Sequence, residues 1–430
     1  MASSRSDLGR SFAAYGANDA DEFPNGGEVV ADLLLQVDLA AWRQEAEDVI
    51  YLDANATTPL LPEVFDAMLP WLREGYANPS GSYMSAKLAR RAIDEARGQV
   101  AELIGADPAE IIFTGGGTES VNAALFSMDR LVGNGTAVVS SIEHSAVLRW
   151  VEAQPRVVTR VAVTPLGRLD MTAFGRALNG AAYVSLMSAN NETGVIQPLQ
   201  EAAALARERG LPVHSDAIQA AGKILIDVRN LGVDMLSLSA HKFHGPKGVG
   251  ALYVREGLSF KPSMLGGGQE SDRRSGTENT AGIVGMGAAA ACMKRANHQR
   301  LGEMRDLFER NVLQRLTGVA INGDVSHRLS NTSHLSFDQC DAAGLLILLD
   351  EAGVACSAGS ACMTGKQKPS HVQMAMGIPE AQAKSSIRFS FSCINTLEEA
   401  ELAAAAVKHA VEKLRRIQGG GVGPVVIYSS

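Results

Sequence analysis

The chain has 430 residues, of which 46% are hydrophobic and 20% are charged, and its formal net charge at pH 7 is −8. This composition predicts a globular protein that is long enough for one large domain and one smaller domain. The acidic balance argues against nucleic-acid binding as a main function, because domains that bind phosphate backbones are usually basic.

The cysteines and the apolar runs predict a cytoplasmic protein. The five cysteines are an odd number without the spacing of a disulfide framework, which fits a reducing compartment. No stretch approaches the roughly 18 apolar residues of a membrane span, and the start of the chain lacks the apolar core of a signal peptide. The cysteines are Cys292, Cys340, Cys356, Cys362 and Cys393.

Residues 1–48 are predicted to form an N-terminal extension. Residues 1–28 are rich in small and polar residues without periodicity, which predicts disorder. Residues 29–48 place apolar side chains at helical spacing and predict an amphipathic helix. This helix either packs on the protein or on a partner, or belongs to an extension without a specific role.

Residues 49–295 are predicted to form a large α/β domain. Short apolar runs alternate here with helical segments, which is the pattern of a mostly parallel sheet with helices between its strands. The expected strands are 110–114, 136–141, 181–187, 211–216 and 234–239.

Residues 296–418 are predicted to form a smaller C-terminal α+β domain, on which the first residues of the large domain also pack. A long helical segment, residues 279–316, leads into it, and a further helix follows Thr396. Residues 419–430 form a tail without an obvious role. The expected strands of this domain are 332–337 and 386–391.

A glycine run, residues 115–117, follows the first expected strand and precedes a helix that begins near Thr118. Ligands of α/β sheets gather at this edge, and glycines before a helix expose N–H groups that suit a phosphate. A turn needed only for packing explains the glycines equally well. The glycine run is not a P-loop, because no Gly-Lys-Ser/Thr follows it.

Two further strand ends carry groups that suit an aromatic cofactor. Asp216 is placed to hold a protonated ring nitrogen and Gln219 to bond a ring oxygen, while a helix N-cap is the alternative for Asp216. Lys242 follows an apolar run, where a lysine held against a core can become a Schiff-base nucleophile. A solvated loop lysine is the alternative, but Ser239 and His241 add two anion-binding groups beside it.

His144, Asn190 and Asn191 follow two other expected strands. An imidazole at such a place suits stacking on an aromatic ring and proton exchange, unless it is an ordinary surface histidine. The two amides suit a cofactor oxygen or a substrate carboxylate, and a simple turn is their alternative.

Cys362 lies in "SAGSACMTGKQKPS", residues 357–370, among small and polar residues. Because a free cysteine normally packs as a small apolar residue, this setting predicts an exposed loop with a reactive thiol. Lys366 and Lys368 are expected to lower the pKa of Cys362, since nearby positive charge favours the thiolate. Cys356 is expected to pack on a strand, with a zinc or disulfide pair as the alternative.

Several motifs occur in a family-like order and spacing: "YLDANATTP", "GGGTES", "IEHSAV", "NNETGVIQP", "HSDAIQAAGK", "SAHKFHGPKGVGALYVR", "GGGQESDRRSGTEN", "SAGSAC" and "SSIRFS". Through them the chain from about residue 50 to 416 resembles the pyridoxal-phosphate-dependent cysteine desulfurases of the NifS/IscS type, within the class V aminotransferase-like, fold-type I enzymes. The resemblance implies a fold-type I transferase that takes sulfur from L-cysteine. It leaves L-alanine and a persulfide on Cys362, which an acceptor protein collects for iron–sulfur cluster assembly or thiolation.

The same resemblance implies roles for single residues. Lys242 matches the lysine that binds pyridoxal phosphate, Cys362 the nucleophile, and His144 the imidazole stacked on the cofactor ring. Arg388 matches the arginine that grips the substrate carboxylate, with Asn191 between cofactor and substrate. The cofactor-binding residues implied are Gly117, Thr118, His144, Asn191, Asp216, Gln219, Ser239, His241, Lys242 and Thr277.

Thr277 matches a threonine that reaches the phosphate of the partner subunit, so the resemblance also implies a homodimer. Asp216 matches the carboxylate that pairs with the pyridine nitrogen, and Gln219 the amide near the ring hydroxyl. No metal, membrane or direct nucleic-acid partner is expected.

Three alternatives remain at this point. A selenocysteine lyase shares the scaffold, although "SAGSAC" with the downstream "PSHV" favours the desulfurase. A class V aminotransferase has no need of a loop cysteine. A catalytically silent scaffold for sulfur-transfer partners has no need to keep the five implied active-site groups, which are Lys242, Asp216, His144, Arg388 and Cys362.

Overall fold

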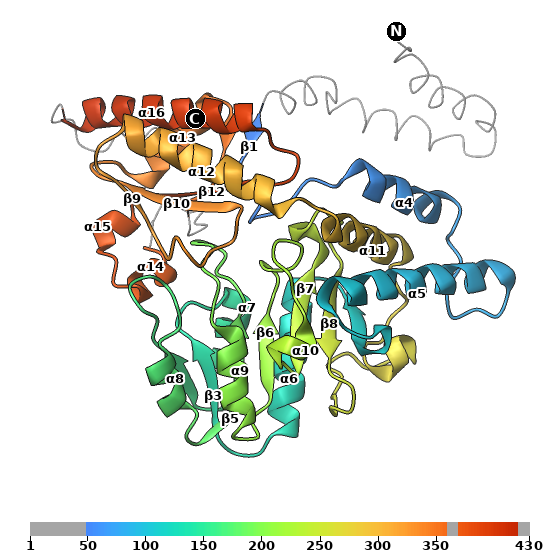
Figure 1. Cartoon of the computed structure of the whole chain (residues 1–430). Helices are drawn as coiled ribbons and strands as arrows, with labels where there is room; N and C mark the ends of the chain where they lie inside the picture. The colour runs from blue at the N-terminus through green and yellow to red at the C-terminus, as the bar shows by residue number, and fades with distance from the viewer. Residues whose placement is uncertain (1–48, 359–368, 420–430) are drawn as a thin grey trace, which may run out of the picture. The chain divides into compact units, whose positions relative to one another are not determined.

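The computed structural model describes residues 49–358 and 369–419 (Figure 1). The chain divides into two compact units, Met1–Val49 and Ile50–Ser430, and the described residues other than Val49 belong to the second. Several predicted features lie outside the described residues: the disordered start 1–28, the helix 29–48, Cys362 with Lys366 and Lys368, and the tail from residue 420 onward.

A seven-stranded sheet forms the centre of the second unit, and it is mostly parallel, as predicted. Its order is β2 (Ile111–Thr114), β8 (Gly250–Val254), β7 (Met235–Ser239), β6 (Val213–Asp216), β5 (Ala181–Met187), β3 (Thr136–Ser140) and β4 (Val158–Val161). Only β8 runs against its neighbours β7 and β2. The strands β4 and β8 were not predicted: β4 is half exposed at the sheet edge, and β8 begins at a glycine.

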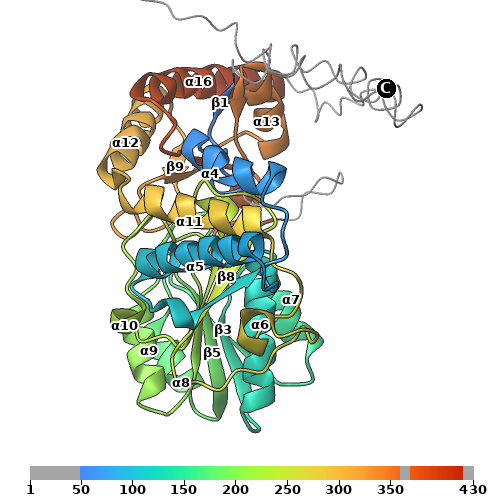
Figure 2. The same ribbon diagram turned by 90° about the vertical axis from the view of Figure 1, so that its right-hand side faces the viewer.

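Helices cover both faces of this sheet, because successive side chains of a buried strand point to opposite sides. They are α5 (Met84–Ile104), α6 (Gly117–Leu131), α7 (Ser145–Ala153), α8 (Met171–Ala177), α9 (Leu199–Arg207) and α10 (Val228–Leu231). In β3, Val138 packs in one hydrophobic cluster with residues of α5 and α9, whereas Ala137 and Val139 pack in another with α6 and α7. Figure 2 shows α9 and α10 on one side of the strands and α6 and α7 on the other.

The segment 279–316, predicted as one long helical stretch, is two helices. The first, α11 (Thr280–Lys294), is rich in Gly and Ala, and packs against α5 and α4 (Pro62–Arg73). A Cβ at Gly287 would lie 2.6 Å from the Cα of Ala96, so this glycine lets α11 approach α5 closely. The side chain of Asn297 then caps a second helix, α12 (His298–Arg315), which begins four residues after the end of α11.

A three-stranded antiparallel sheet, β12-β10-β9, belongs to the C-terminal part of the chain. The predicted strands correspond to β10 (Thr332–Phe337) and β12 (Ser386–Ser390), and β9 (Val319–Ile321) was not predicted. The helices of this part are α12, α13 (Ala342–Glu351), α14 (His371–Ala375), α15 (Glu380–Ala383) and α16 (Leu397–Gly419).

The hydrophobic cluster of the smaller sheet is separate from those of the larger sheet. It includes Phe308 and Phe389, whose ring centroids are 4.7 Å apart. Leu52 joins it, because β1 (Ile50–Tyr51) pairs with β11 (Val354–Ala355) beside this sheet. The first described residues thus pack with the C-terminal part, and the domain boundary at 295/296 stays a prediction.

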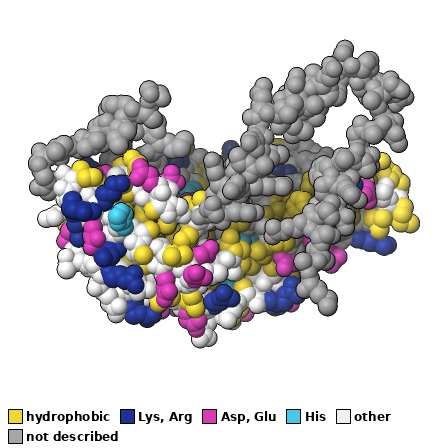
Figure 3. Space-filling view, turned by 90° about the horizontal axis from the view of Figure 1, so that it is seen from above, with side chains coloured by type: hydrophobic (Ala, Val, Ile, Leu, Met, Phe, Trp, Pro, Cys, Tyr) yellow, Lys and Arg dark blue, Asp and Glu magenta, His cyan; other side chains and the backbone are white. Residues whose placement is uncertain are grey.

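Two surface properties can be stated for the described residues. No helix among them is long and apolar enough to cross a membrane. On the face shown in Figure 3, described basic and acidic side chains are interspersed, with hydrophobic side chains between them.

Gly250, the first residue of β8, allows the glycine turn after β2 to lie against the sheet. A Cβ at this position would be 2.6 Å from the carbonyl oxygen of Leu238 and 2.7 Å from the carbonyl carbon of Gly116. Both are backbone atoms, which cannot rotate away as the end of a side chain can. The strand and the turn are therefore this close only with glycine at position 250.

We predict that Gly250→Ala lowers the thermal unfolding temperature, because overpacking of this kind costs about 1–3 kcal/mol. Gly98→Ala is the matched control: it lies inside α5, its added Cβ meets no atom within 4 Å, and alanine favours a helix. An unfolding temperature that is unchanged in Gly250→Ala would contradict this account of the turn.

Candidate active site

A cavity of about 390 Å³ lies at the carboxyl ends of the central strands, beside Arg388 of β12. Thr277 is exposed and does not line it, and Cys362 lies outside the described residues. Ten predicted site residues line it: Gly117, Thr118, His144, Asn191, Asp216, Gln219, Ser239, His241, Lys242 and Arg388.

Lys242 ends a short 3-10 helix, Ala240–Lys242, that directly follows β7. Its Nζ donates hydrogen bonds to the carbonyl oxygens of Asn55 and Ala56, each at 2.7 Å. Burial, and next the charge of Arg388, lower the pKa of Lys242 to about 8. An amine with this pKa is partly neutral near physiological pH, as a nucleophile or a base must be.

Asp216 is the last residue of β6, and His144 is the N-cap of α7, which follows β3. Asp216 is buried and its Oδ1 accepts a hydrogen bond from the N–H of Ile218 at 3.0 Å, and burial raises its pKa. His144 Nδ1 accepts a hydrogen bond from the N–H of Ala146 at 3.1 Å, which puts the proton of the neutral ring on Nε2. Desolvation lowers the pKa of His144 and so favours this neutral form.

The turn between β2 and α6 has the geometry of an anion cradle. Gly116 has φ of 145°, which favours glycine, and a Cβ on Gly117 would lie 2.4 Å from Cδ1 of Ile218, so a larger residue there requires that side chain to move. The free N–H groups of the first turn of α6 and the hydroxyls of Thr118 and Ser239 border the same cavity. This combination suits a phosphate group.

Arg388 is buried and its guanidinium is held by two groups. Nη2 lies 2.6 Å from Oδ1 of Asp53, and Nη1 donates to the carbonyl oxygen of Asn191 at 2.9 Å. Nε is buried and has no hydrogen-bond partner among the described residues. A fixed, desolvated guanidinium with unused N–H groups suits a carboxylate ligand.

The neighbours Asn190 and Asn191 have different environments. Asn190 is buried, and its Oδ1 accepts hydrogen bonds from the N–H groups of Glu192 and Thr193, so it maintains a turn. Asn191 lines the cavity. Cys356 packs against the cluster of the smaller sheet, as predicted, and burial raises its pKa.

Sequence reasoning missed Asn55 and Lys223. The carbonyl oxygen of Asn55 accepts hydrogen bonds from Lys242 and, at 2.9 Å, from Gln219 Nε2. Lys223 is buried, and its Nζ donates to Gln219 Oε1 at 2.8 Å and to Asn55 Oδ1 at 3.1 Å. Both residues are polar and lie within the motifs quoted above. Neither lies at the end of a strand, which was the signal by which other site residues were recognised.

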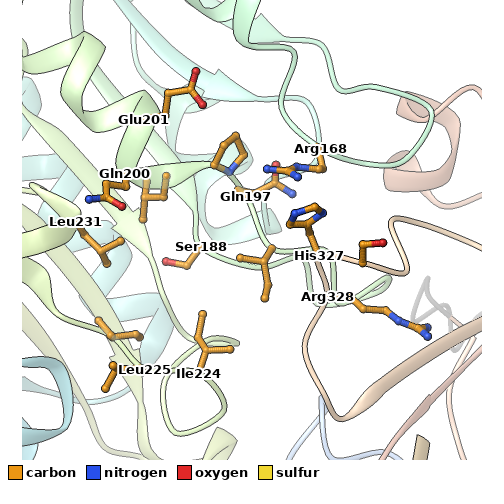
Figure 4. Close-up of a pocket in the computed structure, with 15 residues that line it drawn as sticks. Arg168, Ser188, Gln197, Gln200, Glu201, Ile224, Leu225, Leu231, His327 and Arg328 are labelled. Carbon is orange, nitrogen blue, oxygen red and sulfur yellow. The ribbon is translucent and has the colours of Figure 1, made fainter. Parts of the chain in front are cut away.

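A second cavity, of about 490 Å³, contains none of the predicted site residues (Figure 4). Its basic side chains already have acidic partners: Arg168 lies 3.7 Å from Asp324, and Arg328 lies 2.6 Å from Glu309. Figure 4 shows the Arg328 side chain extending away from Leu225. We therefore assign no ligand to this cavity.

The chain is similar to known proteins of one family. The family description "Aminotransferase class-V" matches residues 50–402. A cysteine desulfurase of Cereibacter sphaeroides is 43% identical over 383 residues, which cover 87% of this chain and 99% of that protein. The chain belongs to the class-V aminotransferase family and, within it, to the cysteine desulfurases.

Two solved structures agree with this membership. A NifS-like protein superposes with a TM-score of 0.79 at 32% identity, covering 85% of this chain and 100% of that one. A structure described as SspA in complex with cysteine has a TM-score of 0.71 at 33% identity, covering 80% and 99%. The predicted fold class, a fold-type I transferase, is confirmed.

Members of this family are pyridoxal-phosphate-dependent enzymes, and the cavity fits that cofactor. It combines a lysine with a lowered pKa, a buried carboxylate and a glycine cradle that a Cβ would fill. These groups suit an aldehyde carbon, a pyridine nitrogen and a phosphate, which are the three reactive or charged parts of pyridoxal phosphate.

Glu143, the residue before His144, has a fully buried carboxyl and does not line the cavity. Its Oε1 accepts hydrogen bonds from Ser140 Oγ at 2.5 Å and from the N–H of Met187 at 2.9 Å. Its Oε2 is buried and has no partner among the described residues. Burial raises the pKa of Glu143 from its ordinary 4.5 to about 8, so the folded protein holds it protonated at neutral pH.

We predict that this carboxyl makes the protein less stable as pH rises. A raised pKa contributes stability that is fully present below about pH 4.5 and is lost as pH rises to about 8. Glu143→Gln keeps an oxygen acceptor but cannot ionise, so its thermal unfolding temperature falls less than that of the wild type between pH 5 and 8. Glu303→Gln, at an exposed position, serves as the control. Parallel curves for the wild type and Glu143→Gln would disprove the prediction.

Proposed function

We propose that this protein takes sulfur from L-cysteine, releases L-alanine and keeps the sulfur as a persulfide on Cys362. The observation that carries this proposal is the gathering of Lys242, Asp216, His144 and Arg388 around one cavity in a chain of the cysteine desulfurase family. Cys362 enters the proposal from the sequence, since it follows Ser357 and Ala358, which line that cavity, by only a few residues.

Pyridoxal phosphate, when bound, supplies an electron sink for bonds at the α-carbon of an amino acid. Lys242 would bind its aldehyde carbon, Asp216 its ring nitrogen and Gln219 its ring hydroxyl. His144 would cover the ring. The residues that would hold the phosphate are Gly117, Thr118, Ser239 and His241, with Thr277 of a second subunit.

The remaining groups act on the substrate. Arg388 and Asn191 would hold the carboxylate of L-cysteine, which fixes the direction of its side chain. Lys242 Nζ, with a pKa of about 8, would accept the proton of the substrate Cα and later return a proton. The Cys362 thiolate would form an S–S bond with the substrate sulfur while the Cβ–S bond breaks. The electron pair of that bond stays on the carbon side, and protonation there completes alanine.

The test of this function incubates the purified protein with L-cysteine and a thiol reductant and measures alanine and sulfide. We expect Lys242→Ala to lose the visible absorbance band of the bound cofactor and to lose activity by at least about 100-fold. Cys362→Ala is expected to form no persulfide, and Cys393→Ala, at an exposed cysteine outside the cavity, is the matched control. No alanine from the wild type would refute the desulfurase function, and sulfide release at the normal rate from Cys362→Ala would refute the role of Cys362.

We further propose a homodimer in which Thr277 of each subunit completes the phosphate site of the other. Thr277 is exposed and lies outside its own cavity, which supports this arrangement. Ser275 Oγ donates to the carbonyl oxygen of Gly267 at 2.7 Å, so the turn with Leu265 is bonded to the segment with Thr277. Leu265 is 84% exposed and its neighbour Met264 is 43% exposed, so both apolar residues are accessible to a second subunit.

Mixed dimers test this arrangement. We expect Thr277→Val to form dimers, as seen by light scattering, that bind pyridoxal phosphate more weakly in both sites. Co-expressed with Lys242→Ala, it should give mixed dimers with one fully intact site, because the Lys242→Ala subunit supplies its own Thr277 to the other subunit. The mixed dimer would then regain one site with wild-type cofactor affinity. A monomer, or weak binding that persists in the mixed dimer, would contradict the proposal.

The sulfur acceptor of this protein is proposed to be another protein, such as an iron–sulfur scaffold. The resemblance to the NifS/IscS type supports this choice. The persulfide on Cys362 would have to leave the cavity to reach such an acceptor.

A further inference from the structure

Lys223 is a buried lysine that the chemistry proposed above does not use. It is 7% exposed, and the partners that the described residues give its Nζ are two amide oxygens. Lysines are almost never buried unless a charged group pairs with them, because burying an unpaired charge is costly. The presence of an amine at this position therefore calls for a physical reason.

The two partners of Lys223 are the side-chain amides of Gln219 and Asn55. Nζ donates to Gln219 Oε1 at 2.8 Å and to Asn55 Oδ1 at 3.1 Å. Burial, and next the charges of Lys242 and Arg388, lower the pKa of Lys223 well below its usual range. A neutral amine keeps two N–H groups, and a protonated amine is only a donor. In both forms the amine suits two oxygen acceptors.

The contact with Lys223 determines how the amide of Gln219 is turned. Its Oε1 faces the donor Lys223, while its Nε2 donates at 2.9 Å to the carbonyl oxygen of Asn55, which can only accept. Both neighbours therefore require the same orientation of the amide. Nε2 carries a second N–H, and Gln219 lines the cavity. The amide thus has an N–H left to donate to a ligand there.

The contact with Asn55 connects Lys223 to Lys242. The carbonyl oxygen of Asn55 accepts from Lys242 Nζ at 2.7 Å, and its side chain accepts from Lys223. Lys223 does not line the cavity that contains Lys242 and Gln219. Its hydrogen bonds therefore reach a ligand in that cavity only through Gln219 and Asn55.

We propose that Lys223 is a positioning residue: it turns the amide of Gln219 so that an N–H of Nε2 is directed at the ring hydroxyl of pyridoxal phosphate. This inference rests on the proposed function and adds a residue to its cofactor site. A hydrogen bond to the ring oxygen favours the form of the bound cofactor that has lost a proton, because it stabilises the negative charge on that oxygen. Lys223 therefore lowers the pH at which the visible absorbance band of the cofactor titrates.

The test is a spectrophotometric pH titration of the holoenzyme. Lys223→Met and Lys223→Leu both keep an apolar side chain in the buried position and remove the amine. We expect the midpoint of the band in each variant to lie at least about half a pH unit above that of the wild type, because Gln219 is no longer held with its N–H toward the ring oxygen. A wild-type midpoint in both variants would overturn the inference.

Two controls separate this effect from a general loss of structure. Asn331 Nδ2 also donates to Asn55 Oδ1, at 3.1 Å, but none of its hydrogen bonds with described residues reaches Gln219. Asn331→Ala should therefore lower the thermal unfolding temperature and keep the wild-type midpoint. Lys294→Met removes an exposed lysine and should keep that midpoint as well. A midpoint that rises equally in Asn331→Ala would assign the effect to Asn55 and overturn the role of Gln219.

A double-mutant cycle tests whether Lys223 acts through Gln219. Gln219→Leu removes the amide and should raise the midpoint by itself. Adding Lys223→Met to it should raise the midpoint no further, because both substitutions remove the same donor from the ring oxygen. Additive shifts would overturn the proposed connection. Absence of alanine from the wild type would refute the desulfurase function, whereas the titration of the bound cofactor would still decide the role of Lys223.

Discussion

The arrangement of the site depends on the hydrogen bonds around Asn55. Its carbonyl oxygen accepts from Lys242 and Gln219, its Oδ1 accepts from Lys223 and Asn331, and its N–H donates to Ser390 Oγ. Lys242, Gln219 and Lys223 follow the central strands β7 and β6 of the seven-stranded sheet. Asn331 directly precedes β10 and Ser390 ends β12, both strands of the three-stranded sheet. Each buried polar group that loses its partner costs roughly 1–3 kcal/mol. These hydrogen bonds therefore fix the two sheets and the segment from Asp53 to Ala56 relative to one another.

The consequence is that the cavity is built by residues far apart in the sequence. Lys242 is aligned by carbonyl groups nearly two hundred positions earlier, and Arg388 is held by Asp53 and by the turn after β5. If only one of the two sheets were folded, the site would therefore be incomplete. The buried carboxyl of Glu143 adds to this dependence, since it bonds the backbone of β5 at Met187.

The buried strands and the polar residues that end them could be predicted from the sequence, because burial leaves a recognisable pattern. Strands that are buried on both faces are continuous apolar runs, and the polar residues that end them, such as Asp216 and Lys242, stand out against that background. Asp53, Asn55 and Lys223 do not, because their roles come from partners that only the folded chain brings near. The edge strand β4 alternates too weakly to be recognised, and the division between α11 and α12 depends on the capping side chain of Asn297.

The electrostatics of the cavity affect both which ligands bind there and how Lys242 reacts. The whole chain is acidic, with a formal charge of −8, yet Lys242, Lys223 and Arg388 lie within one desolvated region. Burial lowers the pKa of both lysines, and the charge of Arg388 lowers each of them further. The guanidinium of Arg388 attracts anionic groups such as a carboxylate, and an anion nearby also favours the protonated form of Lys242. The same desolvation that makes Lys242 a nucleophile strengthens its interaction with an anionic ligand.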